Sequence, residues 1–543
     1  MMRSRKIRNA NIVCALARTT KQMPDETAIV AGKQAISYGD FVAQAQCLAA
    51  NLAPKLKSRR IGILGTRSIE AYLGIAAACW AGATYVPLNL KWPRERLLEL
   101  MGNLKLDAII VDANGARMVD EQVRRLARNT IILPILGEHD EFTTLADLDP
   151  VTMPLPAERD ESDTAYIMFT SGTTGLPKGV VISNGSLATY LDQVRPWTNF
   201  TPQDRVCESC DITFDLSVHN MFLAFETGAS LHLMSPLDMM APQNFIRRNE
   251  VTATLLVPTV VNMMRRAGAL KPNLFPSLRL SVFCGEPLPL TTAQDWADAA
   301  PNAVIENIYG PTEGTVVCTR QTLTDPPLIT ESRNILAIGK PFDSFRIAIL
   351  DDNLKPVRGK KVGQIALHGP QLADGYFNAS RQTDAQFKII DGERWYLTGD
   401  LGYRDRKGVF HHMGRTDNQV KVKGNRIELE EVEMHFRRAC QTDLAAIVAW
   451  PMVDGAAEGL VGFTTSDIRT PKAIQAIMER TLPRYMVPQR IEYRPELPLN
   501  PSGKTDRKAL KAELEGERES ITSAPGMETP EPATAKTDLK VTA

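Results

Sequence analysis

The chain has 543 residues, of which 63 are basic and 63 acidic, so its formal net charge is zero. A chain of this length can hold several hydrophobic cores of ~150 residues each. The balanced charge excludes an overall basic surface of the kind that binds nucleic acid. Eight cysteines without a framework spacing exclude a disulfide-built scaffold and favour a reducing, cytoplasmic setting.

Apolar stretches of strand length alternate with helical stretches along the first part of the chain. Such strands are predicted at residues 61–64, 108–111, 131–133, 254–257 and 280–283. The uncharged run between Glu70 and Lys91 is long enough to span a membrane, but Pro87 and the polar neighbours favour a buried helix that continues into a strand. The alternation therefore predicts an α/β fold of mainly parallel sheets flanked by helices, without a membrane span.

The pattern changes near residue 335, where short strands and Gly or Pro punctuation predict a small β-rich subdomain over about residues 335–416. Helix and strand alternation resumes after Asp417, with a helix predicted at 429–436 and a strand at 445–449. We therefore expect an N-terminal core over residues 1–416 and a C-terminal domain over 417–515. Residues 516–543 are rich in Pro, Ser, Thr and Glu and are expected to form a disordered tail.

The most informative segment is Thr-Ser-Gly-Thr-Thr-Gly-Leu-Pro-Lys-Gly at residues 170–179, directly after the apolar run 166–169. Its three glycines and small hydroxylated residues let backbone N–H groups and hydroxyls surround oxygen anions, and Lys178 adds a mobile positive charge. The loop is not a Walker A motif, because Pro177 stands where that motif needs its second glycine. A generic turn is the alternative, but the composition favours a loop that binds the phosphates of ATP.

This segment resembles the signature loop of the adenylate-forming superfamily, which includes acyl-CoA synthetases, luciferases and the amino-acid adenylation domains of peptide synthetases. Further matches follow in the family's order at residues 214–217, 309–313, 375–376, 396–400, 414–417, 424–429 and 500–504. An ordered series of this kind is far more specific than any one motif. The resemblance implies a large N-terminal domain and a small mobile α+β lid domain, joined at the hinge residue Asp417, with the active site between them.

The resemblance also implies how ATP and Mg²⁺ are held. The residues that would bind ATP are Thr170, Ser171, Gly172, Thr173, Thr174, Lys178, Tyr309, Asp400 and Arg415. Asp400 would accept both ribose hydroxyls, because a carboxylate has two oxygens for a vicinal diol. Glu313 would bind Mg²⁺, which needs only one or two protein carboxylates besides phosphate oxygens.

Two further catalytic roles follow from the same resemblance. Thr312 would contact the α-phosphate, and Lys504 would bridge the substrate carboxylate and the phosphate during adenylation. Rotation about Asp417 would then withdraw Lys504 for the second half-reaction. In isolation, the Ser-Gly-Lys at 502–504 would be a solvated surface turn, and the Gly-Asp at 399–400 would be an ordinary turn.

Asp215, in the Phe-Asp-Leu-Ser motif, distinguishes amino-acid adenylation domains from the other enzymes of the superfamily. In amino-acid adenylation domains the matching aspartate pairs with the substrate ammonium, whereas acyl-CoA synthetases and luciferases generally lack it. A carboxylate in an apolar pocket is costly unless a cation pairs with it. The other predicted substrate-binding residues are His219, Cys284, Ile308 and Val316.

This pocket is mostly apolar and predicts a small or aliphatic amino acid. His219 could hydrogen-bond a hydroxyl of the substrate or narrow the pocket as a neutral ring. Residues 282–289 and 391–394 resemble the D-alanine:carrier protein ligases most closely, and Cys284 matches the cysteine of their alanine pocket. His219 departs from that family, in which a methionine is expected, so glycine, L-alanine, serine, threonine and proline stay open beside D-alanine.

The expected function is ATP-dependent activation of a small or aliphatic amino acid as aminoacyl-AMP, followed by transfer to a phosphopantetheine thiol. The carrier is expected to be a separate protein, because the chain contains no Gly-Gly-x-Ser attachment site. The reaction would belong either to nonribosomal peptide or other natural-product biosynthesis, or to D-alanylation of the cell envelope. An acyl- or aryl-CoA ligase is the enzymatic alternative, and a catalytically silent nucleotide-binding scaffold is the non-enzymatic one.

Overall fold

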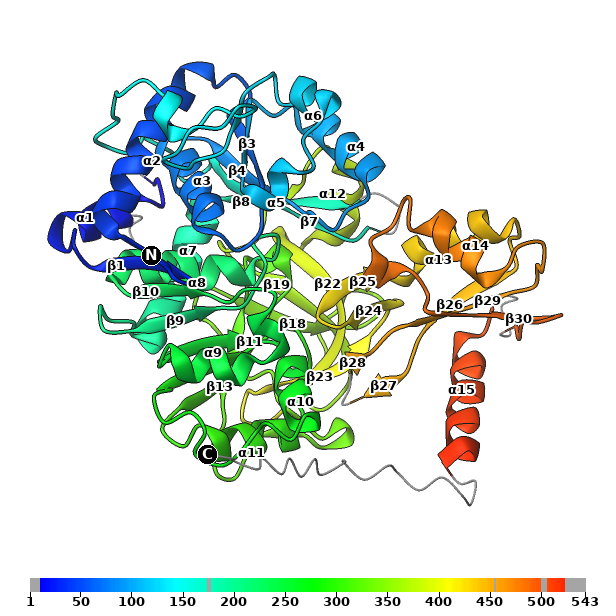
Figure 1. Cartoon of the computed structure of the whole chain (residues 1–543). Coiled ribbons are helices and arrows are strands. Elements are labelled where there is room, and N and C mark those ends of the chain that lie inside the picture. The colour runs from blue at the N-terminus through cyan, green and yellow to red at the C-terminus, as the bar shows by residue number, and fades with distance from the viewer. Residues whose placement is uncertain (1–9, 173–176, 454–455, 500–504, 523–543) are drawn as a thin grey trace, which may run out of the picture.

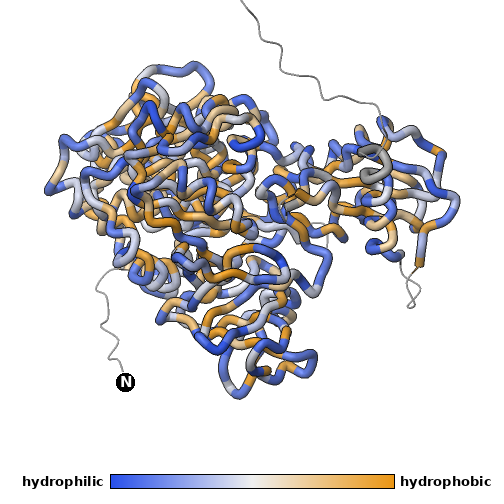
Figure 2. Tube along the Cα trace, turned by 90° about the horizontal axis from the view of Figure 1, so that it is seen from below, coloured by the Kyte–Doolittle hydropathy of each residue, from blue (hydrophilic) through white to orange (hydrophobic). Residues whose placement is uncertain are grey.

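A computed structural model of the chain describes residues 10–172, 177–453, 456–499 and 505–522. Figure 1 shows a large body, which contains the chain up to β23, and a smaller lobe at its side that contains the later elements. In Figure 2 both parts have apolar segments in their interior, so each has a hydrophobic core of its own. The predicted α/β fold with a smaller C-terminal domain is confirmed.

The first large sheet carries the glycine-rich loop and has the strand order β20-β8-β7-β4-β3-β5-β6. Its strands are β3 (Arg60–Leu64), β4 (Thr84–Leu88), β5 (Ala108–Val111), β6 (Ile131–Ile132), β7 (Thr164–Thr170), β8 (Lys178–Ser183) and β20 (Gly375–Tyr376). The strands from β3 to β7 pair in parallel, whereas β8 and β20 are antiparallel to their neighbours. β4 and β5 are buried throughout, as is typical of parallel strands with both sheet faces covered.

The uncharged run between Glu70 and Lys91 forms a buried helix followed by a strand, as expected. Ser68 caps α3 (Ile69–Trp80) by accepting a hydrogen bond from the N–H of Ala71. Every residue of α3 from Ala71 onward is buried, which explains why the helix is apolar on all sides. Among the described residues, no helix is long and apolar enough to cross a membrane.

The second large sheet has the strand order β17-β14-β13-β12-β11-β9-β10-β1-β2. Its strands are β1 (Thr27–Ala31), β2 (Gln34–Ser37), β9 (Arg205–Glu208), β10 (Ser230–Leu233), β11 (Ala253–Leu256), β12 (Leu280–Phe283), β13 (Val304–Tyr309), β14 (Thr319–Thr322) and β17 (Lys340–Pro341). The six strands from β13 to β1 run parallel. The carboxyl ends of β11, β12 and β13 therefore lie at one edge, where ligands bind in open parallel sheets.

The helices of the large domain alternate with these strands. They include α1 (Cys14–Gln22), α2 (Tyr38–Leu52), α4 (Arg94–Leu104), α7 (Asn184–Thr198), α8 (Leu216–Thr227), α9 (Pro242–Arg248), α10 (Pro258–Arg266), α11 (Leu290–Ala299) and α12 (Ser380–Gln386). The predicted β-rich subdomain is present as an antiparallel sheet in the order β18-β19-β22-β21, with β23 paired to β22. Its strands are β18 (Arg346–Leu350), β19 (Gly363–His368), β21 (Phe387–Ile390), β22 (Glu393–Arg404) and β23 (Phe410–Arg415).

The small domain begins after Asp417 with a hairpin of β24 (Gln419–Val422) and β25 (Asn425–Glu428), which leads directly into α13 (Leu429–Cys440). The remaining elements are β26 (Ala445–Ala449), β27 (Met452–Val453), β28 (Ala456–Ala457), β29 (Leu460–Thr464), α14 (Pro471–Met478), β30 (Arg490–Tyr493) and α15 (Arg507–Thr522). Helix and strand were thus predicted correctly at 429–436 and 445–449. Figure 1 places α13 and the β24–β25 hairpin toward the large domain, and β30 and α15 farther from it.

One prediction about the C-terminus is wrong. The expected disordered tail was placed from residue 516 onward, but α15 continues through that point to Thr522. Leu510 and Leu514 are buried against the sheet of β26 and β29, and Glu517 forms an ion pair with Arg490. These contacts stabilise a helix that composition alone did not predict. Residues 523–543 lie outside the described part of the chain.

Candidate active site

The glycine-rich loop follows β7 and precedes β8 in the chain, and two donors at its start, on Ser171 and Gly172, contact the small domain. The hydroxyl of Ser171 donates to the backbone oxygen of Arg426 over 3.0 Å, and the N–H of Gly172 donates to Glu431 Oε2 over 3.2 Å. The hydroxyl oxygen of Thr170 is buried and has no partner among the described residues. Thr173 and Thr174, which we predicted to bind ATP, lie outside the described residues.

Glu313 lies near this loop, in the short turn that follows β13. The residue is 1% exposed. The hydroxyl of Tyr376 donates to its Oε1 over 2.8 Å, and Arg426 Nη1 donates to its Oε2 over 3.2 Å. Burial opposes ionisation of this carboxyl, but Arg426 and Tyr376 outweigh that effect and hold its pKa below the usual value. Lys178 Nζ lies 5.5 Å from the ring centre of the same Tyr376.

These residues fit a magnesium ion bound to phosphates. A buried carboxylate that stays ionised, close to a lysine and to the unpartnered hydroxyl of Thr170, suits a hard cation that keeps phosphate and water ligands. Among the described residues, no group of three or more His, Cys, Asp or Glu side chains could hold a metal by itself. Glu313 would therefore share the ion with the nucleotide.

The predicted ribose-binding residues meet where β22 pairs with β23. This register sets Asp400 opposite Arg415, and Arg415 Nη1 lies 2.5 Å from Asp400 Oδ1. The hydroxyl of Tyr309 donates to the other oxygen of Asp400 over 2.5 Å. Burial alone would raise the pKa of Asp400, but its hydrogen bond to His412 and the charge of Arg415 lower it well below the usual value. Arg415 also binds Asp417, so the predicted hinge is tied to the ribose end of the site.

The predicted amino-acid pocket begins at Asp215, the residue that precedes α8. Its Oδ2 atom is inaccessible to solvent and has no partner among the described residues. Burial raises the pKa of Asp215 to about 6, and a hydrogen bond with the side chain of Thr312 opposes the shift. Thr312 thereby places the predicted ammonium-binding group next to the predicted phosphate-binding motif.

Three other predicted substrate-binding residues lie in one hydrophobic cluster of the large domain. Cys284, Ile308 and Val316 are all buried in it, although they come from three different segments. His219 lies one helical turn after Asp215 on α8, is fully buried, and is hydrogen-bonded through Nδ1 to the hydroxyl of Tyr190 over 2.5 Å. Burial lowers the pKa of His219 to about 3, so the ring is neutral.

Several side chains at the site were missed by sequence reasoning. From the small domain these are Lys421, Arg426 and Glu431, and from the large domain they are Arg96 and His412. Burial lowers the pKa of Lys421, which lies near Cys284, Asp400 and Glu286. The motif at 424–429 was recognised, but only the domain orientation shows which of its side chains reach the large domain. Lys504 lies outside the described residues.

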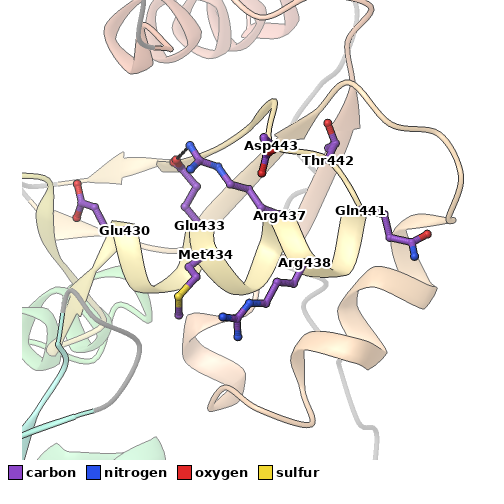
Figure 3. A pocket seen from close by; sticks show the side chains of 8 residues that line it. All are labelled: Glu430, Glu433, Met434, Arg437, Arg438, Gln441, Thr442 and Asp443. Carbon is purple, nitrogen blue, oxygen red and sulfur yellow. Dashed lines mark hydrogen bonds and ion pairs between the residues drawn. The ribbon is translucent and has the colours of Figure 1, made fainter.

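A groove of ≈ 540 Å³ along α13 is separate from these groups. Figure 3 shows its lining, which consists of Glu430, Glu433, Met434, Arg437, Arg438, Gln441, Thr442 and Asp443. Glu433 pairs there with Arg437 and with Arg507 of α15. None of the predicted site residues lines this groove.

Comparison with known proteins identifies the family. Residues 16–377 match the model of the AMP-binding enzymes. The chain belongs to the AMP-binding enzyme family. This adenylate-forming family is the one that the ordered motifs indicated.

Relatives within the AMP-binding family include long peptide synthetases and ligases of about the same length as this chain. Tyrocidine synthase 2 of Brevibacillus parabrevis is 30% identical over 499 residues, which are 90% of this chain but 13% of that protein. The chain therefore spans only a small part of such synthetases. A D-alanine–D-alanyl carrier protein ligase of Bacillus cytotoxicus is 28% identical over 508 residues, which cover 91% of this chain and 97% of that protein.

Solved structures of AMP-binding enzymes give the same fold. The adenylation domain AlmE of Vibrio cholerae, in complex with glycyl-adenosine-5'-phosphate, has a TM-score of 0.83 and 30% identity to this chain. The match covers 95% of this chain and 99% of that one. An artificially fused adenylation–PCP di-domain from Klebsiella oxytoca has a TM-score of 0.75 at 20% identity, which shows the fold alone.

Proposed function

We propose that this chain is an ATP-dependent ligase that activates a small amino acid as aminoacyl-AMP and transfers it to a separate phosphopantetheinylated carrier protein. The observation that carries the proposal is the buried Oδ2 atom of Asp215, which has no partner among the described residues. A carboxylate in such a place needs a cation, and a substrate ammonium supplies one. Its hydrogen bond with Thr312 supports an ammonium position beside the nucleotide motif.

In the first step, a carboxylate oxygen of the amino acid attacks the α-phosphorus of ATP, and pyrophosphate leaves. Two anions must approach each other, so the site has to supply orientation and positive charge rather than a covalent nucleophile. Asp215 orients the amino acid, Asp400 and Tyr309 hold the nucleoside end, and Lys178 faces the phosphates. Magnesium, bound through Glu313, would neutralise charge on the leaving pyrophosphate.

In the second step, the carrier thiol attacks the carbonyl carbon of the adenylate, and AMP leaves. The domain orientation described here suits this step, because the β24–β25 hairpin brings Lys421 near Asp400 and Cys284. Lys504 lies 83 residues after Lys421 in the sequence, outside the described residues. We propose that Lys504 acts in adenylation and Lys421 acts in transfer. Rotation about Asp417 would move Lys504 out of the site and Lys421 into it.

A small side chain is the proposed specificity. The ring of His219 is fixed by Tyr190 and lies 5.9 Å from the ring centre of Trp197, so it fills space one turn beyond Asp215. One relative of known structure, 30% identical to this chain, was solved with glycyl-adenosine-5'-phosphate, and another relative is a D-alanyl carrier protein ligase. Glycine and alanine are therefore the first substrates to test. Both peptide biosynthesis and cell-envelope modification use such a reaction.

The experiment that tests the proposal is carrier loading measured by intact mass. Purified enzyme, ATP, Mg²⁺ and glycine or D-alanine are incubated with stand-alone carrier proteins in the phosphopantetheinylated form. The expected result is a mass gain of one aminoacyl group. The same carriers without phosphopantetheine are the matched control and should gain nothing. Formation of an acyl-CoA from fatty or aryl acids, without loading of any carrier, would support the CoA ligase alternative instead.

A further inference from the structure

The carboxylate of Asp400 is surrounded by donors that belong to the protein itself. Its Oδ1 atom accepts from Arg415 Nη1 over 2.5 Å and lies 3.5 Å from His412 Nε2. Its Oδ2 atom accepts from the hydroxyl of Tyr309 over 2.5 Å. The side chains of Asp400 and His412 are only 10% and 15% exposed. An ionised carboxylate has about four acceptor sites, so three of them are already in use.

A ribose would bring two more donors, its 2'- and 3'-hydroxyls, to a carboxylate with one acceptor site left. One of the three protein donors therefore has to turn away when a nucleotide binds. Arg415 has other partners at hand, because its guanidinium also binds both oxygens of Asp417 and the backbone oxygen of Thr398. Its departure would leave one acceptor site on each oxygen of Asp400, which suits a vicinal diol.

His412 is the donor that is held in place. Arg333, the last residue of the short helix η5 (Glu331–Arg333), donates through Nη1 to His412 Nδ1 over 2.6 Å. Its side chain also donates to the backbone oxygen of His412, and among the residues that the structure describes it forms no ion pair. Burial lowers the pKa of Arg333, and a guanidinium shielded from water without a carboxylate is costly. The contacts of Arg333 therefore serve to hold His412.

This contact also fixes which nitrogen of His412 carries the proton. A guanidinium has donors only, so Nδ1 must keep its lone pair. The proton then lies on Nε2, the atom that faces Asp400 Oδ1. A partner on one ring nitrogen commonly sets the role of the other in this way. The ring thus presents a donor to Asp400 whether or not Arg415 stays.

We infer that His412, supported by Arg333, is a positioning residue that keeps Asp400 oriented and ionised for the ribose of ATP while Arg415 turns toward the nucleotide. The inference rests on the proposed function, because it assigns Asp400 to the ribose. It adds two residues to nucleotide recognition, and both lie outside the motifs at 396–400 and 414–417.

The test compares the binding of ATP with that of 2',3'-dideoxy-ATP, which lacks both ribose hydroxyls. Dissociation constants are measured by isothermal titration calorimetry with Mg²⁺ and without amino acid, so no adenylate forms. In the parent we expect ATP to bind about tenfold or more tightly than the dideoxy nucleotide, as is usual for hydrogen bonds to a charged group. In His412→Phe, which keeps a ring without nitrogens, the ratio of the two constants should fall toward one.

His412→Gln is the rescue variant. A glutamine amide offers an acceptor to Arg333 and a donor to Asp400 at nearly the spacing of the two ring nitrogens. This variant should therefore recover most of the parent's discrimination between the two nucleotides. Arg333→Met should lower the discrimination, because it releases the ring of His412 and its tautomer.

His411→Phe is the matched control, because it makes the same change at the neighbouring residue. His411 Nδ1 is hydrogen-bonded to the hydroxyl of Thr330 and its Nε2 lies 3.6 Å from Asp405, so it does not hold Asp400. Its ratio of dissociation constants should equal that of the parent. Thermal melting by circular dichroism shows which variants are folded. If His412→Phe does not fold, Arg333→Met provides the same comparison.

Amino-acid-dependent ATP–pyrophosphate exchange gives a second readout. In His412→Phe the KM for ATP should rise about tenfold, whereas kcat and the KM for the amino acid should stay near those of the parent. This split is expected because the ribose contact is the same in the ground state and the transition state. A general structural defect would instead lower kcat and affect both substrates.

Equal discrimination in the parent and in folded His412→Phe would overturn the inference. A His412→Gln variant that discriminates no better than His412→Phe would also contradict it, because the acceptor and donor of the ring would then be irrelevant. If the parent performs exchange but these ratios do not differ, the inference fails and the proposed function stands. Absence of both exchange and nucleotide discrimination in the parent refutes the two together.

Discussion

The hydroxyl of Tyr190 and Nδ1 of His219 lie 2.5 Å apart inside the large domain. Burial raises the pKa of Tyr190 well above its usual value and lowers that of His219, so both groups are neutral at physiological pH. Because Tyr190 has no other acceptor among the described residues, its hydroxyl donates and Nδ1 accepts. The imidazole ring is thereby fixed one helical turn from Asp215, where, in the proposed function, it would limit the length of a substrate side chain.

Replacing His219 should widen the choice of amino acid. In His219→Ala we expect ATP–pyrophosphate exchange with valine or leucine to rise relative to glycine and alanine by roughly tenfold or more, the usual effect of a few methylene-sized contacts. Tyr190→Phe is the matched control, since it removes one hydroxyl and keeps both rings, and it should keep the preference for small substrates. An unchanged profile in His219→Ala would show that the ring does not border the substrate.

Asp215→Asn should weaken use of the amino acid and leave use of ATP nearly unchanged. Removing one partner of a buried charge pair costs about 3–5 kcal/mol, so kcat/KM for the amino acid should fall by roughly 10²- to 10⁴-fold. The KM of each substrate in the exchange assay is the measurement. Asp211→Asn, in the same loop, is the control and should leave the amino-acid KM as it is. An equal fall in kcat/KM for the amino acid and for ATP would contradict the role of Asp215 in binding the ammonium.

The raised pKa of Asp215 makes amino-acid use sensitive to acid. Its pKa of about 6 in the ligand-free protein lies above the usual value, so the carboxyl becomes protonated as the pH falls through 6 and the substrate ammonium loses its partner. We expect kcat/KM for the amino acid to fall by up to about tenfold from neutrality to one unit below that pKa. The pH profile should be flat over this range in Asp215→Asn. A profile that rises toward acid would contradict the ion pair.

The two lysines of the small domain should have opposite effects on the two half-reactions. Lys504→Ala should abolish adenylate formation and spare thioester formation from supplied aminoacyl-AMP. Lys421→Ala should spare exchange and slow the transfer, because Lys421 reaches the site in the orientation described here. Lys423→Ala, an exposed neighbour on the same hairpin, is the control for both. Loss of both half-reactions in Lys504→Ala would refute the proposal that Lys504 acts only in adenylation and Lys421 in transfer.

Much of this fold was predictable because its signals are local. The run from Ala71 to Trp80 is apolar on every side, which together with Pro87 favoured an interior helix, and the glycine-rich loop follows its strand directly in the sequence. The pairs Arg96–Glu431 and Arg426–Glu313 were not predictable, because each joins residues far apart in the chain and depends on how two domains are oriented. The last turns of α15 were missed because their stabilising partners lie on β30 and in the core between α15 and the sheet.

The most direct test of the central claim is amino-acid-dependent ATP–pyrophosphate exchange by the purified chain with Mg²⁺. The panel contains glycine, D-alanine, L-alanine, serine, threonine, proline, valine and several aryl and fatty acids. We expect strong exchange with one small amino acid and little with the acids that lack an α-ammonium. Exchange only with aryl or fatty acids would contradict the role of Asp215 and would favour a CoA ligase.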